Sequence, residues 1–181
     1  DINKTHQVTS ARLFDLCEER GLIGTNKTID GSIMHKTSSE FQRGFLRGFF
    51  DADGSVQGTR VKGYTVRLSQ SDKVRLQQAQ LMLARFGIHS TLHKRREAGA
   101  KMLPNSERNL EEYHCKEQWE LIIGKRANME RYQEAIGFYE PLKKERLAAV
   151  LTDYSRPAYR ESMVERIASI EPIGVMPTFD L

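Results

Sequence analysis

The sequence predicts an α+β fold in which a helix is followed by two strands, a second helix, two more strands and closing helices. Apolar and polar residues alternate from Tyr64 to Gln70, which is typical of a half-buried strand. Three of the expected helices end in a glycine followed by an apolar residue, at Gly21, Gly87 and Gly137, as in a Schellman stop. The 181 residues, 39% hydrophobic and 29% charged, suffice for one globular domain with a sizeable core.

The expected elements follow one another in chain order. Helices are predicted at 8–20, 38–53, 72–86, 128–136 and 143–154, and strands at 55–61, 64–70, 89–96 and 112–123. The second helix can begin with a capping box of Thr37 and Glu40 or with Ser38 as its cap, and the third begins after Ser71. The remaining segments are a polar loop at 97–109, a linker at 155–161 and a separate β-like segment at 163–181.

The second predicted helix combines two features that an ordinary core helix avoids. Gly44, Gly48 and Ala52 recur every four residues and therefore share one face. Since each interior glycine costs about 1 kcal/mol relative to alanine, this smooth face predicts that another helix packs there at short range. The helix ends in Asp51 and Asp53, where its dipole disfavours each carboxylate by roughly 0.3–1 kcal/mol and a divalent cation would reverse that penalty. The alternative is an ordinary amphipathic helix followed by a polar turn.

The run from Leu46 to Gly54 resembles the LAGLIDADG motif of homing endonucleases, and it differs only in the types of apolar residue and in Arg47. The resemblance implies a half-unit of that fold with an antiparallel DNA-binding sheet. It also implies metal-dependent hydrolysis of DNA phosphodiester bonds. In the family pattern Asp53 binds Mg²⁺ or Mn²⁺, the Gly54 carbonyl can be a further ligand, and Asp51 more often supports the turn.

Three further residues resemble catalytic positions of the same family. Lys27-Thr28-Ile29 resembles the Lys-x-Ile-Pro block that precedes the second motif in intein endonucleases, with Asp30 in place of the proline. Lys143 resembles the corresponding lysine of the second motif, although the adjacent Lys144 leaves the register open. Gln70 stands where the family often has a polar residue that orders water. For each of these, the alternative is an ordinary polar side chain at the surface.

The middle of the chain is strongly basic. From Gln57 to Lys101 there are ten lysines and arginines and two acids, a net charge of +8. Since the whole chain has a net charge of +4, the remainder has a net charge of −4. This asymmetry favours a nucleic-acid-binding face over an evenly cationic surface. The family fold places that face on the solvent side of four strands, where the candidate DNA-binding residues are Arg60, Lys62, Arg67, His89, His93, Lys94, Arg95 and Arg96. Zinc is not expected at the two histidines, because no cysteine or acid lies at ligand spacing.

The C-terminal residues carry a second resemblance. Val164–Ile170, followed by Phe179-Asp180-Leu181, resembles the penultimate splicing block of inteins, a Hint-like segment in which a Tyr-Asp-Leu triplet enters a strand. Asp180 is therefore the predicted splicing residue. This chain alone is not expected to splice, because the final His-Asn pair lies beyond Leu181 and Asp1 is not a splicing nucleophile.

Together the resemblances predict the second half of an intein-encoded homing endonuclease. Its three parts would be the end of a preceding unit with a connecting loop (1–30), the endonuclease half-unit (31–156), and a linker with the start of the splicing segment (157–181). The expected partners are double-stranded DNA and a second LAGLIDADG unit. Because Lys27 precedes the one motif of this chain, that unit is expected in the preceding half of the same protein rather than in a homodimer mate.

Composition indicates the cellular compartment in which the protein is expected. The chain has no run of about 20 apolar residues and no signal peptide, so no membrane partner is expected, and the predicted location is intracellular, in the cytoplasm or nucleoid. Cys17 and Cys115 are far apart, which indicates a reducing compartment and argues against a disulfide framework or structural zinc. Two alternatives remain open, a DNA-binding regulator on the same fold without cleavage activity and an RNA-splicing maturase.

Overall fold

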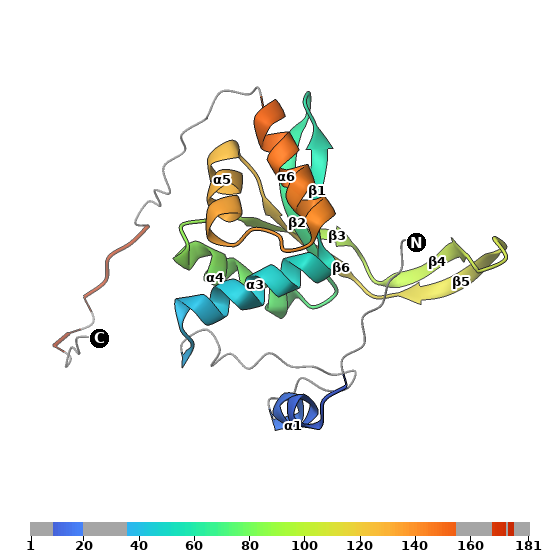
Figure 1. Ribbon diagram of the computed structural model, residues 1–181, viewed down its shortest axis with the longest axis horizontal. Coiled ribbons are helices and arrows are strands. Elements are labelled where there is room, and N and C mark those ends of the chain that lie inside the picture. The colour runs from blue at the N-terminus through green and yellow to red at the C-terminus, as the bar shows by residue number, and fades with distance from the viewer. Residues whose placement is uncertain (1–8, 20–35, 155–167, 173, 176–181) are drawn as a thin grey trace.

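The computed structural model describes residues 9–19, 36–154, 168–172 and 174–175 (Figure 1). Lys27 and Asp180 therefore lie outside the described residues. The elements are α1 (Ala11–Glu19), α3 (Ser39–Asp53), β1 (Gly54–Thr59), β2 (Gly63–Gln70), α4 (Lys73–Arg85), β3 (Thr91–Arg96), β4 (Gly99–Pro104), β5 (Leu110–Cys115), β6 (Gln118–Ile123), α5 (Arg126–Ala135) and α6 (Pro141–Asp153). The α+β class predicted from the sequence is confirmed. Within the described residues, no helix is long and apolar enough to cross a membrane.

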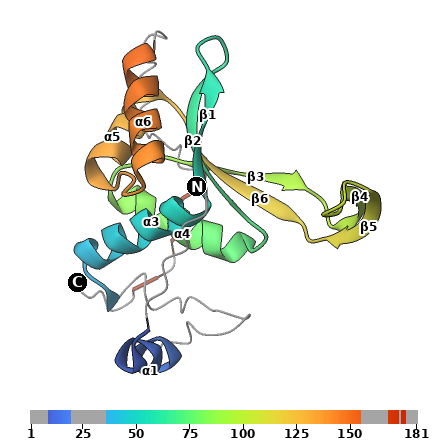
Figure 2. The same cartoon turned by 45° about the vertical axis from the view of Figure 1, so that its right-hand side comes forward.

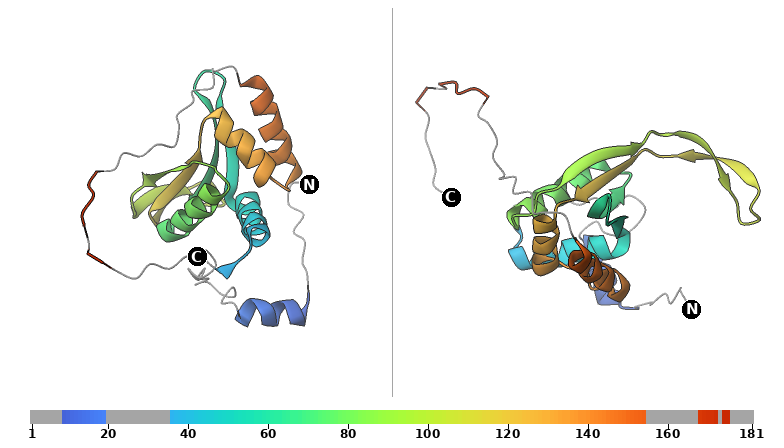
Figure 3. Two further views of the ribbon diagram at one scale, coloured as in Figure 1. Left: turned by 90° about the vertical axis from the view of Figure 1, so that its left-hand side faces the viewer. Right: turned by 90° about the horizontal axis from the view of Figure 1, so that it is seen from above.

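Four strands form one antiparallel sheet in the order β1-β2-β6-β3. Seen from above, the sheet arches over the helices, so that one of its faces is covered and the other carries no helix of the described residues (Figure 3, right). We call the second face the helix-free face. Alternate residues of the central strands supply the covered face, with Val66 opposite Ile123 and Leu68 opposite Leu121, all fully buried. The intervening residues therefore lie on the helix-free face.

The helix α3 contributes its own buried stripe to this core. Leu46 and Phe50 are fully buried, and the ring of Phe50 lies 5.0 Å from that of Tyr132 and 6.5 Å from that of Phe138. Such aromatic pairs stabilise a core beyond their buried area. In α1, by contrast, no residue is buried, and its apolar side chains Leu13, Phe14 and Leu16 are exposed.

Two predictions for the second half of the sheet region were wrong. The segment 97–109 is not a polar loop, because β4 occupies part of it and pairs with β5 in a hairpin that extends away from the main sheet (Figure 2). The strand predicted at 112–123 is two strands, β5 and β6, separated at 116–117. The hairpin is almost entirely exposed, so neither of its strands has the apolar alternation by which strands are predicted.

The helix ends follow local signals. Ser38 caps α3 by accepting a hydrogen bond at Oγ from the Phe41 N–H, which selects one of the two predicted caps. The cap of α4 is Asp72 and not Ser71. Gly87 and Gly137 have φ of 68° and 63°, so both have the predicted left-handed conformation. At Gly87 the Schellman stop is confirmed, because the N–H groups of Gly87 and Ile88 donate to the carbonyls of Ala84 and Leu83; at Gly137 the N–H donates to the Tyr132 carbonyl instead. The third predicted stop, at Gly21, lies outside the described residues.

Candidate functional site

The two acids at the end of α3 have different surroundings. The Asp51 carboxylate accepts hydrogen bonds from the backbone N–H groups of Tyr139, at 3.0 and 3.2 Å, and of Glu140, at 3.2 Å. It thereby holds the connection between α5 and α6 against the end of α3. Asp53 is exposed, and its Oδ2 accepts a 2.6 Å hydrogen bond from Gln70 Nε2. The Asp53 carboxylate therefore faces solvent, while the Asp51 carboxylate is occupied by hydrogen bonds to the backbone.

Of the two adjacent lysines on α6, Lys143 is the one that reaches this helix end. Its Nζ donates to the backbone carbonyl of Asp51 and lies 3.4 Å from that of Phe50. A cation at the C-terminus of a helix is stabilised by the helix dipole and by the carbonyl groups that have no partner within the helix. Lys144 instead lines a pocket between α3, α5 and α6. The structure thus gathers Asp53, Gln70 and Lys143 at one end of α3.

Gly54 permits the abrupt change from helix to strand. Its N–H donates to the Phe50 carbonyl, and a Cβ atom added at Gly54 would lie 2.5 Å from that carbonyl oxygen. No larger residue fits without moving the backbone, so glycine is required here for close approach. The strand β1 consequently begins directly after Asp53 and carries the end of α3 to the edge of the sheet.

Asp53 and the main chain of Gly54 could supply some, but not all, of the ligands of a hard divalent cation. Magnesium is usually held by one or two carboxylates together with substrate phosphates and water rather than by a cage of protein ligands. Asp53 supplies one exposed carboxylate next to the main chain of Gly54. Across the described part of the chain, no group of three histidine, cysteine, aspartate or glutamate side chains could hold a metal ion. Further ligands would have to come from substrate, water or a second unit.

The glycine face of α3 is open. Gly44, Gly48 and Ala52 are exposed, and a Cβ atom added at either glycine would have no heavy atom within 4 Å. The aromatic ring of Phe41, one turn before Gly44, is also exposed. Nothing in the described parts of this chain covers the stripe, so the short-range helix packing that the sequence predicts needs a partner from elsewhere.

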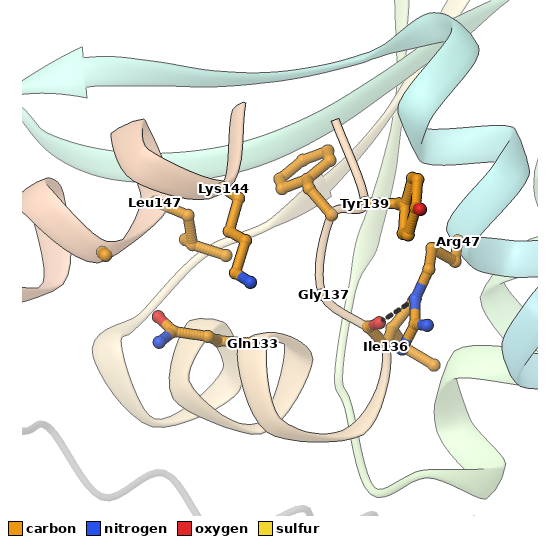
Figure 4. A pocket seen from close by; sticks show the side chains of 9 residues that line it. Arg47, Gln133, Ile136, Gly137, Tyr139, Lys144 and Leu147 are labelled. Carbon is orange, nitrogen blue, oxygen red and sulfur yellow. Dashed lines mark hydrogen bonds between the residues drawn. The ribbon is translucent and has the colours of Figure 1, made fainter. Parts of the chain in front are cut away.

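A shallow pocket of about 340 Å³ lies between α3, α5 and α6 (Figure 4). Arg47 at its edge donates from Nε to the Ile136 carbonyl at 2.7 Å, which ties α3 to the end of α5. This contact gives Arg47, the polar departure from the LAGLIDADG pattern, a structural role. Close to this junction, burial raises the pKa of Tyr132, and the nearby Asp51 carboxylate raises it further. Tyr132 therefore stays neutral in the core.

The helix-free face of the sheet carries only part of the predicted basic set. Strand register places Arg67 opposite Ile122, and Ser69 and His93 on either side of Glu120. Paired residues lie on the same face, so these residues share the helix-free face. Arg95 reaches the same cluster through its contact with Glu120.

One residue of that set, Lys94, lies on the other side of the sheet. Lys94 pairs with Trp119, whose ring also lies 4.4 Å from the Lys73 ammonium of α4, so Lys94 lies on the helix side of β3. There it forms ion pairs with Glu97 at 2.8 Å and Glu117 at 3.2 Å. Those two carboxylates raise the Lys94 pKa, mainly through its hydrogen bond to Glu97.

The remaining candidates lie at the margins of the sheet. His89 precedes β3, which begins at Thr91, so it does not share a strand face with His93. Arg60 and Lys62 are exposed in the turn between β1 and β2, and the Arg96 guanidinium donates to the Lys116 carbonyl at 3.4 Å. The predicted continuous basic face is therefore a smaller cluster on β2 and β3, around Glu120 of β6, with a basic turn at one end.

Sequence reasoning missed Glu120, which is buried on the helix-free face although it is charged. It accepts hydrogen bonds from Arg67 and Arg95. Its signal in the sequence was an acid between Trp119 and Leu121, in the middle of an otherwise apolar strand.

A family model described as a LAGLIDADG-like domain matches residues 40–137, slightly more than half of the chain. The chain is 26% identical over 176 residues to the ribonucleoside-diphosphate reductase NrdEB subunit alpha of Bacillus subtilis (strain 168), which is 96% of this chain and 16% of that protein. It is 28% identical over 150 residues to the DNA-directed RNA polymerase subunit Rpo1C of Methanocaldococcus jannaschii, 81% of this chain and 15% of that protein.

A third relative, the glutamine–fructose-6-phosphate aminotransferase of Methanocaldococcus jannaschii, is 26% identical over 116 residues, 64% of this chain and 9% of that protein. The chain therefore spans no more than 16% of the length of each of these three relatives.

Proposed function

This chain belongs to the LAGLIDADG-like domain family, and from that premise we propose that it is one half of a site-specific, metal-dependent endonuclease that cuts double-stranded DNA. The observation that carries the proposal is the end of α3, where the exposed Asp53 carboxylate lies beside Gln70 while Lys143 caps the same helix terminus. An acid is unfavourable at a helix C-terminus unless a cation offsets it. A carboxylate at this position is useful for phosphodiester hydrolysis, because it can bind the divalent cation that the reaction needs.

The proposed roles follow from these contacts. Asp53, with the main chain of Gly54, would hold Mg²⁺ or Mn²⁺, and such an ion lowers the pKa of bound water and offsets charge on the phosphate. Gln70 orients the Asp53 carboxylate through its 2.6 Å hydrogen bond. Lys143 holds a positive charge next to the acids, where it can meet the negative charge of a phosphate. Lys27, outside the described residues, is proposed as the catalytic lysine of the paired unit.

The relatives support an intein-encoded origin. Their names describe a reductase subunit, an RNA polymerase subunit and an aminotransferase, which share no activity, and each matches this chain over a small share of its length. A segment common to proteins of unrelated activity is the pattern expected of an inserted element. We therefore keep the proposed division into residues 1–30, 31–156 and 157–181, the last as the start of a Hint-like splicing segment with Asp180.

A second LAGLIDADG unit is the proposed partner for the open face of α3. Gly44 and Gly48 leave room for a helix at close range, and pairing there would bring a second set of acids next to Asp53. The exposed apolar residues of α1 agree with its assignment to a preceding unit, because they add nothing to the core of this one.

The activity is tested by selection from a randomised duplex library. The full-length protein is incubated with the library in Mg²⁺ or in EDTA, and the cleaved ends are sequenced. A recurrent cleaved sequence that requires the metal supports the proposal. A recurrent bound sequence without cleavage in either condition supports the DNA-binding regulator instead, and the absence of any selected DNA contradicts both.

The salt dependence of DNA binding should distinguish the two sides of the sheet. We expect Lys62→Ala to lower the slope of log affinity against log salt by about 0.9, because it removes one phosphate contact from the exposed β1–β2 turn. Lys94→Ala is the matched control, since Lys94 lies on the helix side and is paired with two glutamates. Titrations of the full-length protein at several salt concentrations measure both slopes. Equal losses for the two variants would contradict this orientation of the sheet.

A further inference from the structure

We propose that Glu120 is a positioning residue that fixes Arg67 and Arg95 for reading base edges, so that it sets the sequence discrimination of the sheet. The inference rests on the proposed function and adds a specificity device to it. Its basis is a buried carboxylate in the middle of the face that is otherwise suited to DNA.

Both oxygens of Glu120 are engaged. Oε2 accepts from Arg67 Nη1 at 3.0 Å, while Oε1 accepts from Arg95 Nη1 at 3.2 Å and from Ser69 Oγ at 3.3 Å. The Glu120 side chain is only 6% exposed, although no helix covers this face. The three strands β2, β6 and β3 thus each contribute to one polar cluster.

Arg67 and Arg95 are oriented by these hydrogen bonds, and both keep N–H donors that the bonds do not occupy. Arg67 also donates from Nε to Thr65 Oγ1 at 2.8 Å, so its guanidinium is fixed at two points. A guanidinium has five N–H donors, which leaves three on Arg67 outside these two contacts. The Arg95 side chain is 52% exposed and is joined to Glu120 through one nitrogen. Both forks therefore keep donors for a ligand while their orientation is set.

Neither stability nor general DNA affinity accounts for a glutamate here. Replacing a buried ion pair with apolar residues is often neutral or stabilising, so the pair adds little net stability. A carboxylate also repels phosphates, so it weakens binding that depends only on charge. A pre-oriented guanidinium, however, loses less freedom when it binds two acceptors of a guanine, and such bidentate contacts discriminate between bases.

The test is Glu120→Gln in the full-length protein. Affinity is measured without divalent metal for the selected target, for targets with single base changes and for random duplex, together with the thermal midpoint. We expect the target-to-random affinity ratio to fall at least about tenfold, the loss of one good base contact. Affinity for random duplex should be unchanged or higher, because a negative charge is removed.

Glu117→Gln is the matched control. It removes a carboxylate just before β6, but one that pairs with Lys94 on the helix side, so the affinity ratio should stay unchanged. A parallel loss of affinity for target and random duplex in Glu120→Gln would make Glu120 merely structural and overturn the proposal. An unchanged ratio would overturn it as well.

Arg67→Lys and Arg95→Lys keep the proposal testable if Glu120→Gln does not fold. Each keeps the charge but removes the fork, so each should relax discrimination while affinity for random duplex is kept. Unaltered discrimination in both would refute the inference. A wild-type protein that selects no DNA sequence would instead refute the proposed function itself.

Discussion

Replacing Asp53 with asparagine should reduce DNA cleavage by the full-length protein on the order of 10³-fold while DNA affinity changes little. The reason is that metal ions contribute several kcal/mol to such reactions, about three decades in rate, and Asp53 is the exposed acid at the end of α3. Affinity should survive because it comes mostly from lysine and arginine contacts to phosphates. Single-turnover cleavage in Mg²⁺ and binding in EDTA measure the two effects separately.

The same substitution should not destabilise the fold. Asparagine keeps an acceptor for Gln70, and it removes a carboxylate that the dipole of α3 disfavours by roughly 0.3–1 kcal/mol. Asp153→Asn is the control, because Asp153 is also the last residue of a helix and accepts a hydrogen bond, from Tyr64, but lies at the far end of α6 from Lys143. Undiminished Mg²⁺-dependent cleavage by Asp53→Asn would contradict the assignment, as would an equal loss in Asp153→Asn.

The parts of the fold that could be predicted from the sequence are those specified by neighbouring residues. Helix α3 was predicted at 38–53 and is Ser39–Asp53, because a serine cap begins it and Gly54 allows the chain to leave at once. The stops at Gly87 and Gly137 were likewise predictable, since the left-handed conformation favours glycine whatever the tertiary context.

The features that were missed depend on what lies across the sheet. The hairpin of β4 and β5 has no buried face, so its residues carry no periodic signal. Lys94 was counted with the basic surface, although it lies two residues after Leu92 and therefore on the same side of the strand. The role of Glu120 could not be derived at all, because its partners Arg67 and Arg95 come from two other strands that only the fold brings together.

In the candidate site, too, the sequence predicts the local features and the structure adds the long-range contacts. The motif alone predicts that Asp53 ends a helix, and it separates Asp53 from Asp51 only by resemblance to the family. The structure adds a physical distinction, since the Asp51 carboxylate is occupied by the backbone of residues 139 and 140. It also brings Lys143, 92 residues away from Asp51 in sequence, to the same helix end. No local pattern encodes such a long-range contact.

Gly48→Leu should weaken pairing of the two units while leaving the fold of this one intact. Within this chain a Cβ at Gly48 meets no heavy atom within 4 Å, and leucine favours a helix over glycine by nearly 1 kcal/mol, so the thermal midpoint should stay or rise. At a close helix crossing, overpacking costs about 1–3 kcal/mol, roughly a 5- to 150-fold loss in pairing. Because pairing sets the distance between the two acids, cleavage should fall with it.

Two controls separate this effect from a general one. Gln77→Leu adds the same apolar side chain to an exposed position of α4, away from the stripe, and should leave cleavage unchanged. Gly54→Ala should give the opposite pattern, a lower thermal midpoint, because its Cβ would lie 2.5 Å from the Phe50 carbonyl oxygen. Thermal unfolding of this chain, sedimentation of the paired units and cleavage by the full-length protein decide the matter. If Gly48→Leu retains full cleavage and normal stability, the glycine stripe of α3 is not the surface on which the two units meet.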